Sequence, residues 1–195
     1  KVTISDDAAV SIAATVLSDI GNKTSGVVTV TNAIVITGTA VQVTAALVTT
    51  ATLVVAATAL ATISDDADTS IAATVLSEIG AKTSGVVTVT NAIIITGSNT
   101  EITAALITTA SLVVAATAKV TISDDADTSI AATVLSTIGA ITSGVVTVTY
   151  AIIITGSNTE VTAALVTTSS LVVAAIAKVT ISDDAAVSIA ATVLS

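Results

Sequence analysis

The residues best suited to do chemistry in this chain are carboxylates in the motif Asp-Asp-Ala-Asp. The motif occurs twice, 59 residues apart, as Asp65, Asp66 and Asp68 and as Asp124, Asp125 and Asp127. Three carboxylates within four residues supply the hard oxygen ligands that Ca²⁺ prefers. Alternatively, Asp beside a helix N-terminus caps the helix and complements its dipole. The motif therefore predicts either a weak surface calcium site or a set of helix caps, and no other cofactor is expected.

The remaining residue types exclude the familiar catalytic sites. The chain has no His and no Cys, so Ser-His-Asp, Cys-His and zinc sites cannot be assembled. Its nine Gly residues fall at three repeated positions, and none lies in a G-x-G-x-x-G or P-loop context. Further copies of the acidic motif, at residues 6–9 and 183–186, carry Ala in place of the third acid. We therefore expect that the chain is not an enzyme.

Pairs of Thr separated by one residue recur in register along the chain. The pairs are Thr29 and Thr31, Thr88 and Thr90, and Thr147 and Thr149. A flat, regular Thr array orders water in ice-binding proteins, so these pairs indicate a surface-binding role. Since the pairs occur once per 59 residues, two strands per repeat would place their rows roughly 10 Å apart. The alternative is an ordinary solvated strand face.

The composition limits the partners of the chain. Only 10% of its 195 residues are charged, 53% are apolar, and Tyr150 is the single aromatic residue. With a net charge of -9 and five basic residues, it lacks the basic surface that nucleic acid or anionic lipid requires. Residues 24–64 carry no charge, but Thr and Ser interrupt the run and aromatic belts are missing. We therefore expect neither nucleic-acid binding nor membrane insertion.

The elements that carry these motifs come from a tandem repeat. The sequence Thr-Ile-Ser-Asp-Asp starts at residues 3, 62, 121 and 180, which divides one array into repeats at 3–61, 62–120 and 121–179 and a partial repeat at 180–195. Residues 178–195 are identical to residues 1–18. We interpret the chain as a segment of a longer periodic molecule, or as a designed sample of one.

Each repeat divides into two related halves, and each half predicts a strand, a cap, a short helix and a strand. In the first half, Ile71, Val75 and Ile79, with Ala72 and Leu76, form the apolar stripe of a helix of about three turns. Gly80 would end this helix in a left-handed conformation. The second half starts its helix with an S-x-x-E capping box. The boxes are Ser98 with Glu101, Ser157 with Glu160, and Thr39 with Gln42.

The segments between the helices alternate between apolar and polar residues as strands do. Residues 112–123 predict one strand whose face from Leu112 to Ile122 is wholly apolar. Residues 86–96 predict a second, with a bend at Asn91. Together they indicate an α/β solenoid, in which parallel strands and short helices stack coil on coil with about 27 to 32 residues per coil. Separate globular units joined like beads are the alternative.

The unit from 62 to 90, TISDDADTSIAATVLSEIGAKTSGVVTVT, resembles the Ala/Thr/Val/Ser-rich tandem repeats of giant cell-surface proteins of cyanobacteria and other bacteria. The resemblance covers essentially the whole chain and implies an extracellular or cell-surface structural role. A consensus design based on such repeats is the alternative. We expect coils to associate end to end with other copies or neighbouring repeats, because open strand edges can accept further strands. A calcium-dependent adhesin or an ice-binding surface is the second hypothesis.

Overall fold

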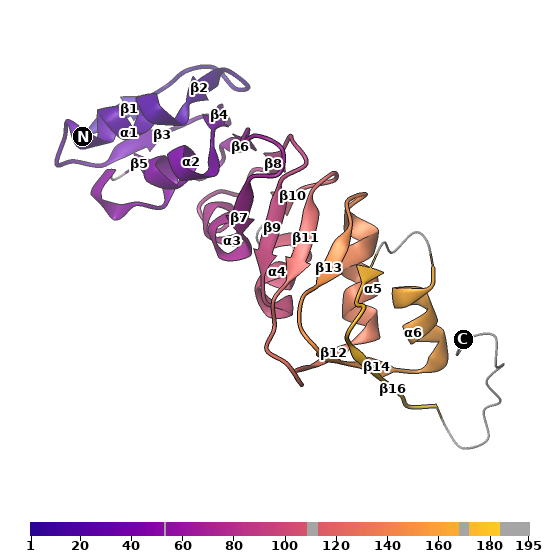
Figure 1. Ribbon diagram of the computed structural model, residues 1–195. Helices are drawn as coiled ribbons and strands as arrows, with labels where there is room; N and C mark the ends of the chain where they lie inside the picture. The colour runs from indigo at the N-terminus through magenta and orange to yellow at the C-terminus, as the bar shows by residue number, and fades with distance from the viewer. Residues whose placement is uncertain (53, 109–112, 168–171, 184–195) are drawn as a thin grey trace.

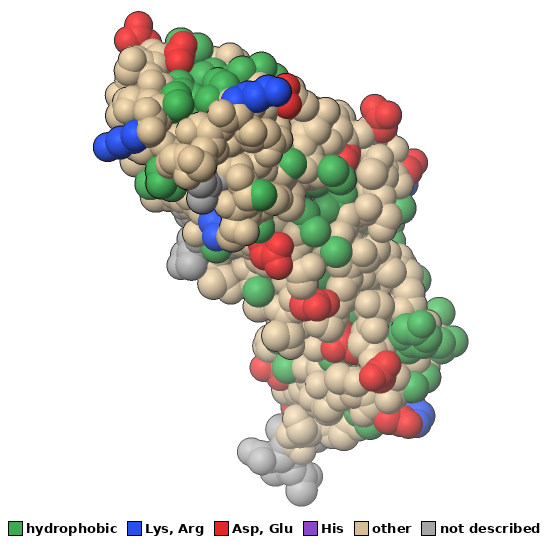
Figure 2. All heavy atoms as spheres, turned by 90° about the vertical axis from the view of Figure 1, so that its left-hand side faces the viewer, with side chains coloured by type: hydrophobic (Ala, Val, Ile, Leu, Met, Phe, Trp, Pro, Cys, Tyr) green, Lys and Arg blue, Asp and Glu red, His purple; other side chains and the backbone are tan. Residues whose placement is uncertain are grey.

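The computed structural model describes residues 1–52, 54–108, 113–167 and 172–183. Figure 1 shows an elongated molecule in which successive repeats follow one another from the N-terminus at one end to β16 at the other. Most of the partial repeat at 180–195 lies outside the described residues, as does Leu112. Figure 2 shows acidic side chains scattered over one side of the molecule, with no single acidic patch.

The helices are short and recur twice per repeat. Their bounds are α1 Ala14–Asn22, α2 Ala40–Leu47, α3 Ala73–Gly80, α4 Asn99–Leu106, α5 Ala132–Ile141 and α6 Asn158–Leu165, with a 3-10 turn at η1 Thr50–Thr52. The capping boxes at Thr39, Ser98 and Ser157 are confirmed, with both hydrogen bonds of each box present. In the described part of the chain, no helix has the length and apolarity to cross a membrane.

All the paired strands run parallel. The first repeat contributes β1 Val2–Ile4, β2 Ser11–Ala13, β3 Val28–Val30, β4 Val35–Gly38 and β5 Val54–Val55. The second contributes β6 Leu60–Ile63, β7 Ser70–Ala72, β8 Val87–Val89, β9 Ile94–Gly97 and β10 Val113–Val114. The third contributes β11 Lys119–Ile122, β12 Ser129–Ala131, β13 Val146–Val148, β14 Ile153–Gly156 and β15 Val172–Val173, and β16 Lys178–Ile181 follows.

The strands form successive sheets that are offset by one repeat. The sheet orders are β1-β3-β5, β10-β8-β6-β4-β2, β15-β13-β11-β9-β7 and β12-β14-β16, and no sheet closes on itself. A step along a ladder joins residues 24 to 26 positions apart, as in Ile12 with Ile36 and Thr3 with Thr29. Two such steps do not use up the 59 residues of a repeat. The remainder forms the acidic turn and an extra strand, β7 or β12, which opens the next sheet.

The expectation of about 27 to 32 residues per coil is therefore wrong. It divided the repeat into two equal coils, whereas one coil in two carries the extra strand. As a result, the strand that starts each repeat lies at the centre of its sheet: β6 pairs with β4 on one side and β8 on the other. The fold is α/β, with parallel sheets and short helices repeated along the chain.

The single strand expected over residues 112–123 is also wrong. A turn separates β10 from β11, and the amide of Ala118 donates to the carbonyl of Ala115 across 3.1 Å. The turn changes which face points inward, so Val114 is exposed while Val120 is buried. Small residues form this turn without Gly, Pro or Asn, which is why the sequence did not signal it. The bend expected at Asn91 is confirmed.

The first helix of each repeat starts later than expected. Ile71 and Ala72 belong to β7, and Ala72 is exposed, so the stripe expected across both residues is wrong. The buried residues of α3 are Ala73, Leu76, Ile79 and Gly80. The local pattern is ambiguous because a strand passes directly into the helix, and the inward positions of the two elements merge into one apolar run.

Glycine serves close packing here and does not end helices in a left-handed conformation. Gly80 is the last residue of α3, and no described Gly has a positive φ. At Gly85, an added Cβ would lie 2.2 Å from the carbonyl oxygen of Ala59 in the preceding coil. Gly21 faces the carbonyl of Thr52 in the same way. A side chain at either position would collide with backbone atoms that the neighbouring coil cannot easily move.

Candidate functional site

The acidic motif lies in the turn between β6 and β7, at the junction of two repeats. Asp65 is 8% exposed, and its Oδ2 accepts a hydrogen bond of 2.6 Å from the amide of Ala40, the first residue of α2. Asn91 donates from Nδ2 to the carbonyl of Asp65 across 2.7 Å. The turn is therefore held by the coil before it and by the coil after it. A carboxylate at a helix N-terminus is favoured by the free amides and the helix dipole.

The same junction recurs in each following repeat. Asp124 Oδ2 accepts from the amide of Asn99, at the start of α4, across 2.6 Å, and Asp124 Oδ1 accepts from Asn99 Nδ2 across 2.8 Å. Asp183 Oδ2 accepts from the amide of Asn158, at the start of α6, across 2.7 Å. The first acid of the motif thus caps a helix 25 residues earlier in the chain. The helix that follows the motif, α3, has no side-chain cap.

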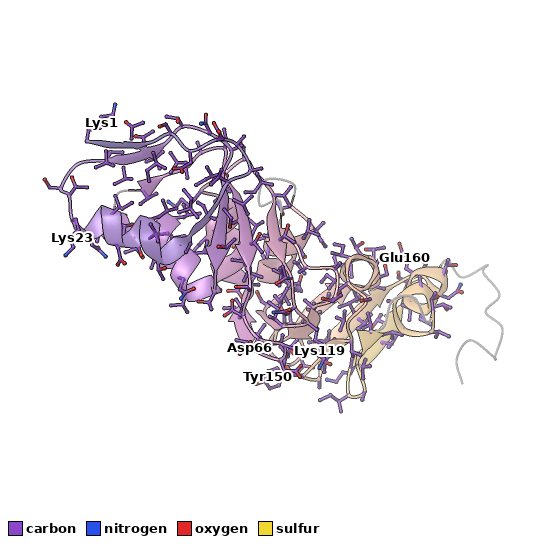
Figure 3. All side chains as sticks on the ribbon, turned by 90° about the horizontal axis from the view of Figure 1, so that it is seen from above. Lys1, Lys23, Asp66, Lys119, Tyr150 and Glu160 are labelled. Carbon is purple, nitrogen blue, oxygen red and sulfur yellow. The ribbon has the colours of Figure 1, made fainter. Side chains whose placement is uncertain are left out.

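The third acid of the motif makes an ion pair with the next repeat. Asp68 Oδ1 lies 2.6 Å from Lys119 Nζ, and Asp127 Oδ1 lies 2.5 Å from Lys178 Nζ. Both Asp residues have positive φ, 64° and 65°, a conformation that Asp tolerates better than most residues. Figure 3 shows Lys119 near Asp66 at the same edge of the molecule as Tyr150. These exposed pairs contribute little to stability.

The ion pair and its absence follow one another between repeats. In the first repeat, Ala9 stands where the others have Asp68 and Asp127, and Leu60 stands where they have Lys119 and Lys178. Both members of the pair therefore change together, from two charges to two apolar side chains. This linked change was the sequence signal for the contact, and it was missed because the partners are 51 residues apart.

The second acid, Asp66, is exposed to solvent. The three carboxylates of the motif thus point to different places: one to the preceding helix, one to solvent and one to a Lys of the next repeat. Within the described ranges, no group of three or more Asp, Glu, His or Cys side chains is arranged to hold a metal ion. Calcium binding by Asp65, Asp66 and Asp68, or by Asp124, Asp125 and Asp127, stays a prediction.

The Thr pairs take part in two different arrangements. The second Thr of each pair is tied to the preceding coil: Thr31, Thr90 and Thr149 donate from Oγ1 to the carbonyls of Ile4, Ile63 and Ile122. The first Thr stands in a row of neighbouring strands, with Thr37 beside Thr62 and Thr62 beside Thr88. Strands in a sheet lie about 4.8 Å apart. The expected separation of roughly 10 Å between Thr rows is therefore wrong for these positions.

The next sheet carries an equivalent row, Thr96, Thr121 and Thr147. Sequence reasoning missed both rows because it did not pair the Thr of the Thr-Ile-Ser-Asp-Asp strand with strands on either side. The rows end in apolar residues, since Thr88 pairs with Val114 and Thr147 with Val173. Each is thus a short strip of methyl and hydroxyl groups along a half-exposed sheet face.

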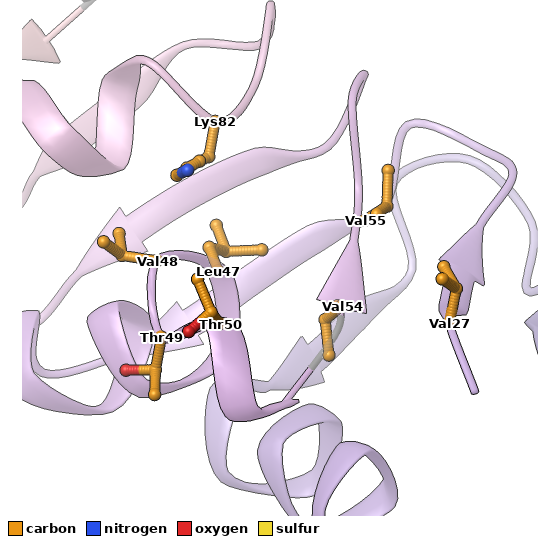
Figure 4. A pocket seen from close by; sticks show the side chains of 8 residues that line it. All are labelled: Val27, Leu47, Val48, Thr49, Thr50, Val54, Val55 and Lys82. Carbon is orange, nitrogen blue, oxygen red and sulfur yellow. The ribbon is translucent and has the colours of Figure 1, made fainter. Parts of the chain in front are cut away.

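Grooves lie where helices of neighbouring coils meet the strands. A cavity of about 250 Å³, shown in Figure 4, is lined by Leu47, Val48, Val54 and Val55, with Lys82 at its edge. Lys82 is the one charged residue among its lining residues. A larger groove of about 440 Å³ lies between α2 and the segment from Asp65 to α3. Both are lined mainly by apolar side chains of the junction between repeats, which suits packing better than acid-base chemistry.

Comparison with known proteins adds no relative: no family model, no curated protein and no solved structure matches the chain significantly.

Proposed function

We propose that this chain is a structural repeat module, an α/β solenoid that forms part of an extracellular fibre or cell-surface protein and extends by stacking end to end. The observation that carries the proposal is the repeated junction, in which Asp65, Asp124 and Asp183 cap helices of the preceding repeat with the same geometry. An interface that is the same at every step can be continued without limit, because each repeat presents to the next what it received from the last.

The extracellular or cell-surface location rests on the resemblance to the repeats of giant bacterial surface proteins. A catalytic role is not part of the proposal, because the chain lacks the His and Cys on which most nucleophilic and acid-base sites depend. An array that serves as a spacer needs length, regularity and a surface that resists other partners. The net charge of -9 helps to keep separate arrays soluble.

Electron microscopy over a concentration series, with sedimentation of the same samples, tests this proposal. We expect short rods at low concentration and filaments at high concentration, with an axial period set by the repeat. Isolated rods of one length at every concentration would contradict self-association. The same samples with and without calcium would show whether assembly depends on the ion.

The rows of Thr support a second candidate, a surface-binding module that orders water. Thr37, Thr62 and Thr88 stand on adjacent strands, which gives the regular spacing that such a surface requires. Thermal hysteresis measured on the purified chain tests this role. A Thr62→Lys variant would interrupt the row and should abolish the effect, whereas Ser77→Lys on α3 should leave it unchanged. A chain without hysteresis, or one whose hysteresis survives Thr62→Lys, would contradict this candidate.

A further inference from the structure

The face of the first repeat that points away from the array has apolar residues that are covered in later repeats. Ile79 in α3 and Ile138 in α5 are 0% exposed, whereas Ile20, at the same position of α1, is half-buried. Val16 in α1 is 47% exposed. The difference arises because α2 packs against α3 and α4 packs against α5. Figure 3 shows this end of the molecule, where Lys1 and Lys23 lie.

The opposite end has the complementary face on α6. Val43 in α2 and Ile102 in α4 are 0% exposed, while Val161, at the same position of α6, is half-buried. Leu165 is half-buried as well. The helices α2 and α4 each have a helix of the next repeat packed against them. The face of α6 therefore matches, residue for residue, a surface that receives α3 or α5 elsewhere in the chain.

The strand beside this face is held by contacts that a second copy can also make. β16 pairs with β14 so that Thr180 lies beside Thr155. Asp183 then accepts from the amide of Asn158 across 2.7 Å. Because residues 1–18 have the same sequence as residues 178–195, β1 carries the same side chains as β16. In the first repeat, the carboxylate of Asp6 is exposed and accepts no hydrogen bond from the described residues.

We propose that two copies of this chain join by strand exchange: β1 of one copy takes the place of β16 on β14 of the other, and α1 packs against α6. The proposal rests on the proposed self-association and specifies its register. Thr3 lies beside Thr155 of the other copy, and Asp6 accepts from the amide of Asn158. Lys1 reaches Asp127, the residue that Lys178 contacts within the chain.

The exchange is favourable because its losses are replaced in kind. The incoming strand restores each backbone hydrogen bond that β16 gives up, since the two segments are identical. In addition, α1 arrives already packed against α2 of its own copy, so little ordering accompanies its docking. The apolar side chains Val16 and Ile20 of one copy and Val161 of the other then leave water, which supplies the net driving force.

Disulfide trapping tests the register, and the natural absence of Cys makes it clean. A chain with Thr3→Cys and Thr155→Cys should form disulfide-linked dimers and longer ladders under mild oxidation, because neighbouring strand positions suit disulfide geometry. Thr3→Cys with Ile153→Cys is two residues out of register and should give no ladder. Thr96→Cys with Thr121→Cys tests the equivalent pair within one chain and should give a linked monomer.

The outcomes separate this inference from the proposed function. Ladders from the in-register pair alone support strand exchange. Assembly in sedimentation without ladders would overturn the exchange and leave self-association standing, whereas no ladders and no assembly would overturn both. As a second measurement, Asp6→Asn should weaken association about tenfold, the effect of losing a charge-assisted hydrogen bond. Asp7→Asn is the matched control, and equal effects of the two variants would contradict the assigned role of Asp6.

Discussion

The carboxylate of Asp65 and the backbone amide of Ala40 are joined by a hydrogen bond of 2.6 Å that links two repeats. The bond places a nearly buried negative charge at the N-terminus of α2, where the helix has free amides and a positive dipole end. The acidic turn is thus a fastening between coils. Its three acids have separate positions, and each contributes through different partners.

Replacing Asp65 with Ala should lower the free energy of unfolding by about 1 to 2 kcal/mol, the usual effect of removing a helix cap. The loss arises because the amide of Ala40 is left without its partner in a buried setting. Urea unfolding followed by circular dichroism measures the change. Asp66→Ala is the control, since Asp66 is exposed and should tolerate the change. If both variants unfold at the same urea concentration as the parent chain, Asp65 does not act as a cap.

Ala9 has a φ of 66°, in the left-handed region. An L-residue with a Cβ is strained there by about 1 to 2 kcal/mol, and Gly is not. We therefore expect Ala9→Gly to stabilise the protein by about 0.5 to 1 kcal/mol after the entropy of the more flexible unfolded chain is subtracted. Ala8→Gly, next to it and without a positive φ, should destabilise. Calorimetric melting of both variants decides, and the same sign for both would contradict the strain.

Tyr150 occupies the position that Asn32 and Asn91 hold in the other repeats. Each of those Asn side chains donates to the carbonyl of the first acid of its motif, Asp6 or Asp65, across 2.7 Å. Tyr150→Asn should restore this bond to Asp124 and stabilise the third repeat by about 1 kcal/mol. Hydrogen exchange of the amides in residues 120–150 would show slower opening there. The reverse variant, Asn91→Tyr, should speed exchange in the second repeat, and unchanged rates in both would contradict the prediction.

Calcium binding by the acidic motif predicts saturable heat in a titration with Ca²⁺ and a higher melting temperature in its presence. The ion would have to compete with Lys119 for Asp68, which lie 2.6 Å apart. Lys119→Ala should therefore bind Ca²⁺ more tightly than the parent chain. Asp66→Asn should bind it less tightly, because a ligand charge is lost. Equal heats with Mg²⁺, or no heat in any variant, would contradict a calcium site.

Short-range features of this fold could be predicted from the sequence. The capping box of Ser98 and Glu101 was found because its partners are three residues apart on one turn of helix. The burial of Val87 and Val89 beside exposed Thr88 follows from strand alternation alone. The 59-residue period needed no structure either, because the chain repeats its own letters. Signals of this kind depend on neighbouring residues and the geometry of a single element.

Only the tertiary structure decided which helix Asp65 caps, because its partner, Ala40, lies 25 residues earlier in the chain. The same holds for the Thr row at Thr62, which depends on strands from two other coils. These relationships follow from the step of 24 to 26 residues between paired strands and from the extra strand that opens each new sheet. The step is set by how coils pack on one another, so the sequence determined the repeat and its elements, and packing between coils determined the register.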